Sequence, residues 1–310
     1  MEVDALNIMG GHRIRCVTRN QFASHHNVTA MALPLPTDVV DLILGFFQAD
    51  LVTLKTCAQS HPTLAKLSER YIYAKITLHD DLDSDKIDPL AGSLRTTEFA
   101  QILDKSPGIA NHVRSLKIYV NNKEEPKQLE ATVSHLNSVA SILPTFLGLT
   151  KIAIEKTPRY ITILSWHTLP ETFRQVFLNI LRVQDMKEVS ISCITFFPLS
   201  LLDNCKNRNV KVTLDMCQET RCDRKSKERG SFEHLSVENY SGTYVEGIIA
   251  WIQTHGLRSL KFVPLYRQVW QYRLLLPPFL AACSSTLTNL DVGIEDEHCT
   301  SLSFLELHSF

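Results

Sequence analysis

The sequence predicts an α/β fold in which an N-terminal helical segment precedes a curved, mainly parallel sheet. Three observations lead to this prediction. Residues 35–78 contain three short segments with helical spacing. After them the pattern apolar-x-x-apolar-x-apolar recurs, and its second half alternates as a strand with one buried face does. Helix-like segments separate the copies, which follow one another at roughly 23 to 37 residues with one short last step, as in stacked strand–helix units.

Four segments divide the 310-residue chain. Residues 1–32 have no sustained period and several polar clusters, so we expect a flexible N-terminal arm. Residues 33–79 form the predicted helical domain. Residues 80–97, which begin with an aspartate-rich stretch, form a linker. Residues 98–310 hold the repeated strand–helix units, which we expect to bind a substrate or partner protein.

The first predicted helix is unusually apolar. It begins at Pro36-Thr37-Asp38, where Thr37 or a neighbour can cap the helix and acidic side chains suit the helix dipole. Apolar residues then occupy one helical face at i, i+3, i+4 and i+7, and a second face beside it. The first face consists of Val39, Leu42, Ile43 and Phe46, and the second of Val40, Leu44 and Phe47. Such a helix cannot remain solvated on either side, so we expect it to pack on its own domain and on a partner.

Two further helices complete the predicted domain. Asp50 can cap a helix from Leu51 to about Ser60, which His61-Pro62 ends. A third helix runs from Thr63 to about Ala74 and leads into an extended segment. That segment is Ile76-Thr77-Leu78.

Seven clear copies of the strand pattern and one weaker copy follow. The clear copies are Val113-Leu116-Ile118, Leu149-Ile152-Ile154, Met186-Val189-Ile191, Phe232-Leu235-Val237, Leu257-Leu260-Phe262, Leu287-Leu290-Val292 and Leu302-Leu305-Leu307; the weaker one is Val212-Leu214. The helix-like segments are 98–105, 129–142, 171–182, 244–255 and 268–282. Residues 157–170 interrupt the order and are predicted to be an insertion.

Composition narrows the classes of protein that fit. Hydrophobic residues make up 44% of the chain, charged residues 21%, and the formal net charge is -1. This balance argues against attraction of the whole protein to nucleic acid or to an anionic membrane. No signal peptide or transmembrane segment is visible, and the eight scattered cysteines are typical of reduced, buried thiols. We therefore expect a cytoplasmic or nuclear protein without a membrane partner.

Motifs for catalysis or cofactor binding are missing from the sequence. It contains no G-x-G-x-x-G, P-loop, G-x-S-x-G or H-E-x-x-H. Cys217 and Cys222 lack the paired spacing of a zinc site, and the basic run from Arg221 to Arg229 has no interleaved aromatic residues. We expect a solvated loop at this run, and neither an enzyme nor a bound cofactor or metal.

Residues 35–78 resemble the F-box family, in particular the divergent F-boxes of fungal proteins that precede leucine-rich repeats. The residues that carry the resemblance are Leu35-Pro36, Val39, Leu42, Ile43, Leu54, Cys57, Tyr71, Tyr73 and Ile76-Thr77-Leu78. The chain departs from the family in three places. The acidic residue that usually follows Leu-Pro is reached at Asp38. The tryptophan typical of the third helix is missing, and the segment before that position reads Ser60-His61-Pro62-Thr63.

The resemblance implies an adaptor with two binding ends and no chemistry of its own. One end would dock on the Skp-type subunit of a cullin-RING (SCF) ubiquitin ligase, and the other would select a substrate protein for ubiquitin-dependent degradation. The docking face implied by the resemblance consists of Leu35, Pro36, Val39, Leu42, Ile43, Phe46, Leu54 and Cys57. An adaptor of this kind raises the effective concentration of the substrate near the ligase.

The strand–helix part would be an irregular, leucine-rich-repeat-like solenoid, whose outward strand positions are the natural face for a substrate. These positions are Lys117, Tyr119, Glu155, Ser190, Asp215, Glu238, Lys261, Asp291 and Glu306. Adding Lys151 and Lys211 nearly evens their charges, so the sequence indicates no charge preference for a partner. An alternative remains open: the helical domain is a degenerate F-box that no longer engages a ligase and caps a protein-binding scaffold.

Overall fold

A computed structural model describes residues 35–79, 93–120, 126–156, 164–207, 209–215, 217, 232–240, 246–264 and 269–292. The chain divides into two compact units. Unit 1 comprises Met1–Thr162 and Thr168–Met186, and unit 2 comprises Ile163–His167 and Lys187–Phe310. The predicted arm, the basic run, the strand copy at 302–307 and Glu306 lie outside the described residues.

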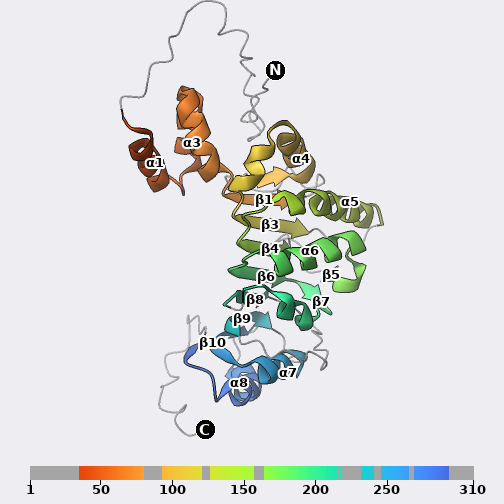
Figure 1. The fold of residues 1–310 in the computed structure, drawn as a ribbon. Coiled ribbons are helices and arrows are strands. Elements are labelled where there is room, and N and C mark those ends of the chain that lie inside the picture. The colour runs from red at the N-terminus through yellow and green to blue at the C-terminus, as the bar shows by residue number, and fades with distance from the viewer. Residues whose placement is uncertain are drawn as a thin grey trace, which may run out of the picture. The chain divides into compact units, whose positions relative to one another are not determined.

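Unit 1 begins with the three predicted helices (Figure 1). These are α1 (Thr37–Phe46), α2 (Leu51–Ser60) and α3 (Pro62–Ile72). The Asp50 carboxylate accepts a hydrogen bond from the Thr53 N–H at 3.0 Å, which confirms the predicted cap of α2. The prediction of a side-chain cap on α1 is wrong, because Pro36 precedes the helix and supplies none.

The rest of unit 1 is a parallel sheet with helices between its strands. The elements are β1 (Lys75–His79), β2 (Ser93–Arg95), α4 (Thr96–Lys105), the 3-10 helix η4 (Pro107–His112), β3 (Ser115–Val120), α5 (Pro126–Ile142), the 3-10 turn η5 (Leu143–Thr145), β4 (Lys151–Lys156) and α6 (Glu171–Val183). The strand order is β4-β3-β1-β2, and each pair is parallel. Strand β1 follows α3 in the chain and pairs with β3, so the helical segment leads directly into the sheet. The predicted linker at 80–97 therefore falls inside this unit, and its last residues form β2 and the start of α4.

Unit 2 repeats the parallel arrangement. Its elements are β5 (Leu164–Ser165), followed by the 3-10 turn η6 (Trp166–Thr168), then β6 (Glu188–Ser192), β7 (Ile194–Thr195), the 3-10 helix η7 (Leu199–Asn204), β8 (Lys211–Asp215), β9 (Phe232–Tyr240), α7 (Glu246–His255), β10 (Leu257–Pro264), α8 (Val269–Cys283) and β11 (Asn289–Val292). The order is β11-β10-β9-β8-β6, with all resolved pairings parallel, and β5 pairs separately with β7. The predicted α/β class, with parallel strands and intervening helices, is confirmed.

Both units bury one face of their strands, except at β11, where no residue is fully buried. In β3 the side chains alternate between half-buried and buried, and the buried ones are Leu116, Ile118 and Val120. In β8 the buried pair is Val212 and Leu214. The helices contribute the matching apolar side chains, including Phe99, Leu136, Phe173 and Phe177 in unit 1 and Ile248, Trp251 and Phe279 in unit 2. The opposite face of the strands therefore carries the polar residues.

Two neighbouring residues of β8 test this one-sided burial. Val212→Ala removes two fully buried methyl groups, and we expect it to lower the free energy of unfolding by about 2 kcal/mol. Thr213→Ala removes a side chain of the same shape from the half-exposed face, and we expect a loss below about 1 kcal/mol. Urea denaturation of the full chain measures both values. Equal losses would contradict the assigned orientation of β8.

Candidate functional site

Helix α1 buries only one narrow stripe. Val40 and Leu44, one turn apart, are 7% and 2% exposed, and α1 packs on α3. The remaining apolar side chains of the helix point away from this contact. The sequence pattern predicted apolar residues on two faces of this helix, and within the described residues only one of them is covered.

An exposed apolar surface results, which we call the apolar helix face. The name covers the exposed apolar side chains in and beside the first two helices, which are Leu35, Val39, Leu42, Ile43, Phe46, Phe47 and Val52. These seven are among nine large apolar side chains exposed in the described part of the chain; the other two are Leu147 and Val183. Leu42 is 65% and Phe46 79% exposed. Val39, Leu42, Ile43 and Phe46 share one face of α1 by their spacing, whereas single exposed apolar side chains are normally scattered.

The structure separates the residues that the sequence assigned to the docking face. Leu35, Pro36, Val39, Leu42, Ile43 and Phe46 are exposed, and Cys57 is half-buried. Leu54 is fully buried in α2, which packs on α3, so its side chain belongs to the core of the helical segment. Phe47 and Val52 were not predicted in this role. Phe47 was assigned to the second face of the helix, and Val52 follows no apolar repeat.

A polar clamp holds α1 on α3 beside this face. The Tyr71 hydroxyl donates to the Asp41 carbonyl oxygen at 3.0 Å, with the Asp41 carboxylate at 3.2 Å, and Arg70 forms an ion pair with Asp41. A Cβ atom on Gly45 would lie 3.2 Å from the Tyr71 hydroxyl, so a glycine allows this close approach. A depression of about 470 Å³ lies here, lined by Asp38, Asp41, Leu42, Gly45, Phe46, Gln48 and Tyr71. The clamp therefore fixes the position from which Leu42 and Phe46 project.

Side chains cap the starts of α2 and α3. Hydrogen bonds from the side chain and the backbone N–H of Thr53 hold the pKa of the Asp50 carboxyl below its usual value, so it caps α2 as a carboxylate. The His61 Nδ1 atom accepts from the Thr63 N–H at 3.1 Å at the start of α3. Burial, with a smaller effect of the Glu69 charge, raises the pKa of Tyr73 to about 12. Tyr73 thus remains a neutral core side chain where the chain enters β1.

The predicted sheet residues of unit 1 form a small ionic cluster. Lys117 Nζ lies 3.0 Å from a Glu155 carboxylate oxygen and 5.7 Å from the centre of the Tyr119 ring. Tyr119 and Glu155 are direct partners in the register of β3 and β4. The pKa of Lys117 is raised: burial alone would lower it, and the hydrogen bond and charge of Glu155 outweigh that effect. This cluster is half-exposed on the polar side of the sheet.

The outward residues predicted in unit 2 also lie on one side of the sheet, one on each of five neighbouring strands. Ser190, Asp215, Glu238 and Lys261 alternate with the buried residues of β6, β8, β9 and β10, and Asp291 lies between the half-buried Leu290 and Val292 of β11. Lys261 Nζ lies 2.9 Å from the Glu238 carboxylate, and Lys261 and Asp291 are register partners. The structure therefore brings all five onto one polar face.

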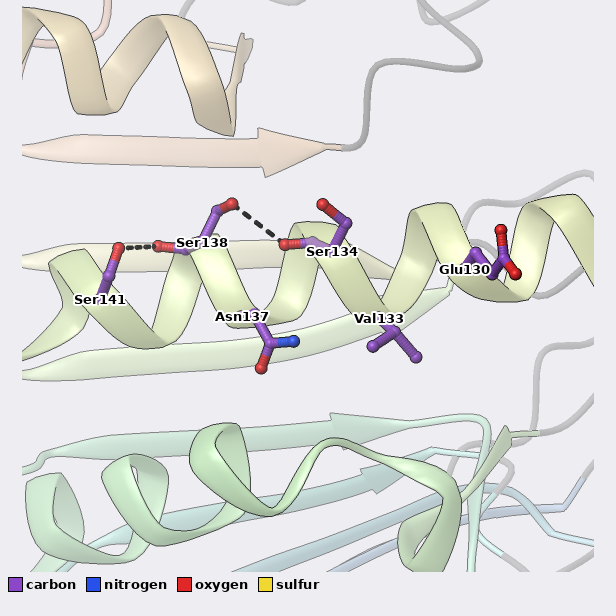
Figure 2. A pocket seen from close by; sticks show the side chains of 6 residues that line it. All are labelled: Glu130, Val133, Ser134, Asn137, Ser138 and Ser141. Atoms are coloured by element: carbon purple, nitrogen blue, oxygen red, sulfur yellow. Dashed lines mark hydrogen bonds between the residues drawn. The ribbon is translucent and has the colours of Figure 1, made fainter.

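The longest described helix, α5, carries a row of small polar residues that offers little chemistry. Figure 2 shows Ser134, Ser138 and Ser141 along its surface. The Ser138 hydroxyl donates to the Ser134 carbonyl oxygen at 3.0 Å and the Ser141 hydroxyl to the Ser138 carbonyl oxygen at 2.7 Å. Asn137 accepts a bond from Thr172 of α6 at 2.5 Å. These groups are used within the helix and its contact with α6.

The described residues contain no group of three His, Cys, Asp or Glu side chains that could hold a metal ion. Burial raises the pKa of the Cys217 thiol to about 12 and that of Cys283 above its usual value, which makes both poor nucleophiles. Among the described helices, none has the length and apolar character needed to cross a membrane.

Comparison with known proteins gives no family assignment. No protein-family model matches the chain, and no curated protein is detectably similar to it.

The clamp beside the apolar helix face generates a stability prediction. Tyr71→Phe removes the hydroxyl that bonds Asp41, and we expect the free energy of unfolding to fall by about 1 kcal/mol. Tyr119→Phe removes a hydroxyl from the sheet face of the same unit and is the matched control, with an expected change within about 0.5 kcal/mol. Urea denaturation compares the two. A loss for Tyr119→Phe as large as for Tyr71→Phe would contradict the role of the clamp.

Proposed function

We propose that this chain is an F-box-type adaptor that links a target protein to an SCF ubiquitin ligase and performs no catalysis itself. Residues 33–79 would dock on the Skp-type subunit, and the strand–helix part would bind the target. The exposed apolar helix face is the observation that carries the proposal. It contains five of the eight residues that the resemblance places at the docking surface.

The energetics of this face support a partner rather than a solvated helix. Covering a large apolar side chain contributes about 1.5–3 kcal/mol, so burial of Leu42, Ile43 and Phe46 alone would supply much of the free energy of a stable complex. The clamp at Asp41 and Tyr71 keeps α1 in place without a partner. Binding to a surface that is already ordered avoids part of the entropic cost of association.

The exposure of this face also bears on the alternative, in which a degenerate F-box serves only to cap a scaffold. A cap would bury its apolar residues against the structure that it covers. Leu42, Phe46 and Val52 are instead the most exposed of the seven, at 65%, 79% and 73%. This arrangement favours docking on a separate protein.

Substitution of the face tests the proposal. We expect tagged full-length protein to capture a purified fungal Skp-type subunit and the Leu42→Asp variant to lose that capture, because a charge cannot be buried in an apolar interface without a partner. Leu147→Asp is the matched control: it places the same charge at another exposed leucine of unit 1, which is 70% exposed, and should leave capture unchanged.

Circular dichroism and the thermal midpoint of each variant show whether it is folded. Capture by Leu42→Asp at the level of the wild type would remove α1 from the interface. Failure of the folded wild type to capture the subunit would overturn the adaptor proposal and leave the capped scaffold as the better interpretation.

A further inference from the structure

The polar face of unit 2 is arranged in rows that the strand register defines. The first row crosses β6, β8, β9 and β10 and consists of Glu188, Lys211, His234 and Ser259. The second row also reaches β11 and consists of Ser190, Thr213, Ser236, Lys261 and Asp291. The third row consists of Ser192, Asp215, Glu238 and Val263. Small hydroxyl side chains thus lie between rows of longer, charged ones. Val263 is the single apolar residue of these rows, so this face suits a polar partner rather than an apolar one.

Two carboxylates are direct neighbours on this face. Asp215 of β8 and Glu238 of β9 are register partners. Side chains at such positions on adjacent strands, about 4.8 Å apart, interact closely, and like charges there are destabilising. Lys261, whose Nζ atom lies 2.9 Å from a Glu238 carboxylate oxygen, offsets part of that repulsion, and a cationic group of a partner would offset more of it.

Buried serines hold both carboxylates in position. The Ser192 hydroxyl donates to an Asp215 carboxylate oxygen at 2.6 Å, and the Ser236 hydroxyl donates to a Glu238 oxygen at 2.7 Å. Ser192 is 9% and Ser236 2% exposed, so the longer acidic side chains cover them. Carboxylates oriented in this way lose little freedom when they bind a cationic group.

The charge of the face is negative. Its rows carry the four acids Glu188, Asp215, Glu238 and Asp291 and the two amines of Lys211 and Lys261, which leaves an excess of two negative charges. Lys261 and Lys211 form ion pairs with Glu238 and Glu188 at 2.9 and 3.7 Å. Partial burial alone would raise the pKa of Glu238, but hydrogen bonds from Lys261 and Ser236 and the charges of Lys261 and Lys211 hold it below its usual value.

Unit 1 has the opposite balance. The outward positions of β1, β3 and β4 carry Lys75, Lys117 and Lys151 against the single carboxylate of Glu155. The described outward strand positions of unit 2 are therefore more negative than those of unit 1, and a basic segment suits them better. The excess negative charge of the unit 2 face also opposes the binding of nucleic acid there.

We propose that the polar face of unit 2 binds an extended segment of a partner protein that carries arginine or lysine side chains, with Asp215 and Glu238 receiving one of them. The proposal rests on the proposed function, because it specifies the class of target that the adaptor would select. The hydroxyls of Ser190 and Thr213 offer hydrogen bonds to the polar groups of such a segment beside the charged contact.

A labelled peptide tests the proposal with the full chain. An extended peptide of about eight residues is long enough to cross five strands. We expect a fluorescein-labelled peptide of alternating arginine and serine to bind in fluorescence anisotropy at about 0.1 M salt, and one of alternating glutamate and serine not to bind. The isosteric double variant Asp215→Asn/Glu238→Gln should weaken arginine-peptide binding by about tenfold.

The matched control is the double variant Asp104→Asn/Glu130→Gln. It changes the net charge equally at exposed positions of α4 and α5 and should bind the peptide as the wild type does. Equal weakening by both double variants would reduce the effect to net charge and overturn the proposal. Equal affinity for the glutamate peptide, or no binding by a wild type that circular dichroism shows to be folded, would also overturn it.

Capture of the Skp-type subunit by the same proteins separates this proposal from the adaptor proposal. If the basic-segment proposal alone fails, the peptide does not bind as expected and capture by the wild type persists. If the adaptor proposal alone fails, the wild type does not capture the subunit, while the peptide still binds and still responds to Asp215→Asn/Glu238→Gln.

Discussion

One-sided burial of the parallel strands is the constraint on which the rest of the structure depends. Alternate residues such as Leu116 and Ile118, or Val212 and Leu214, are removed from water beneath apolar helix side chains. Because successive side chains of a strand point to opposite faces, the same alternation leaves a polar surface on the other side. The ion pairs of Lys117 with Glu155 and of Lys261 with Glu238 lie on that surface. Packing thus creates the surface to which we assign target binding.

The helical segment does not bury all of its apolar side chains as the strands do. Helix α1 is apolar on more than one side and covers only Val40 and Leu44, while the Asp41–Tyr71 clamp fixes its position on α3. The apolar area that stays exposed on α1 favours association with another molecule. The two surfaces differ in chemistry: one is apolar on helices, and the other is polar on strands. Binding two dissimilar proteins requires such a difference.

Local periodicity predicted much of this fold. The alternation in 116–118 or 212–214 was sufficient to place β3 and β8, since burial of one face requires a period of two. Strand β2 was missed because three residues, Ser93–Arg95, carry no period and are defined by their pairing with β1. Helical spacing likewise showed that α1 has two apolar faces but not which one α3 covers. Leu54 was assigned to the docking face by the resemblance alone, although the contact of α2 with α3 buries it.

Hydrogen–deuterium exchange of the full chain, alone and with a purified Skp-type subunit, tests the central claim most directly. Exchange reports protection segment by segment, so it locates an interface without any substitution. The adaptor account predicts that the subunit slows exchange in peptides covering residues 35–54 and leaves those of β8, β9 and β10 unchanged. Unchanged exchange at 35–54 under conditions where the subunit is in excess would contradict the account.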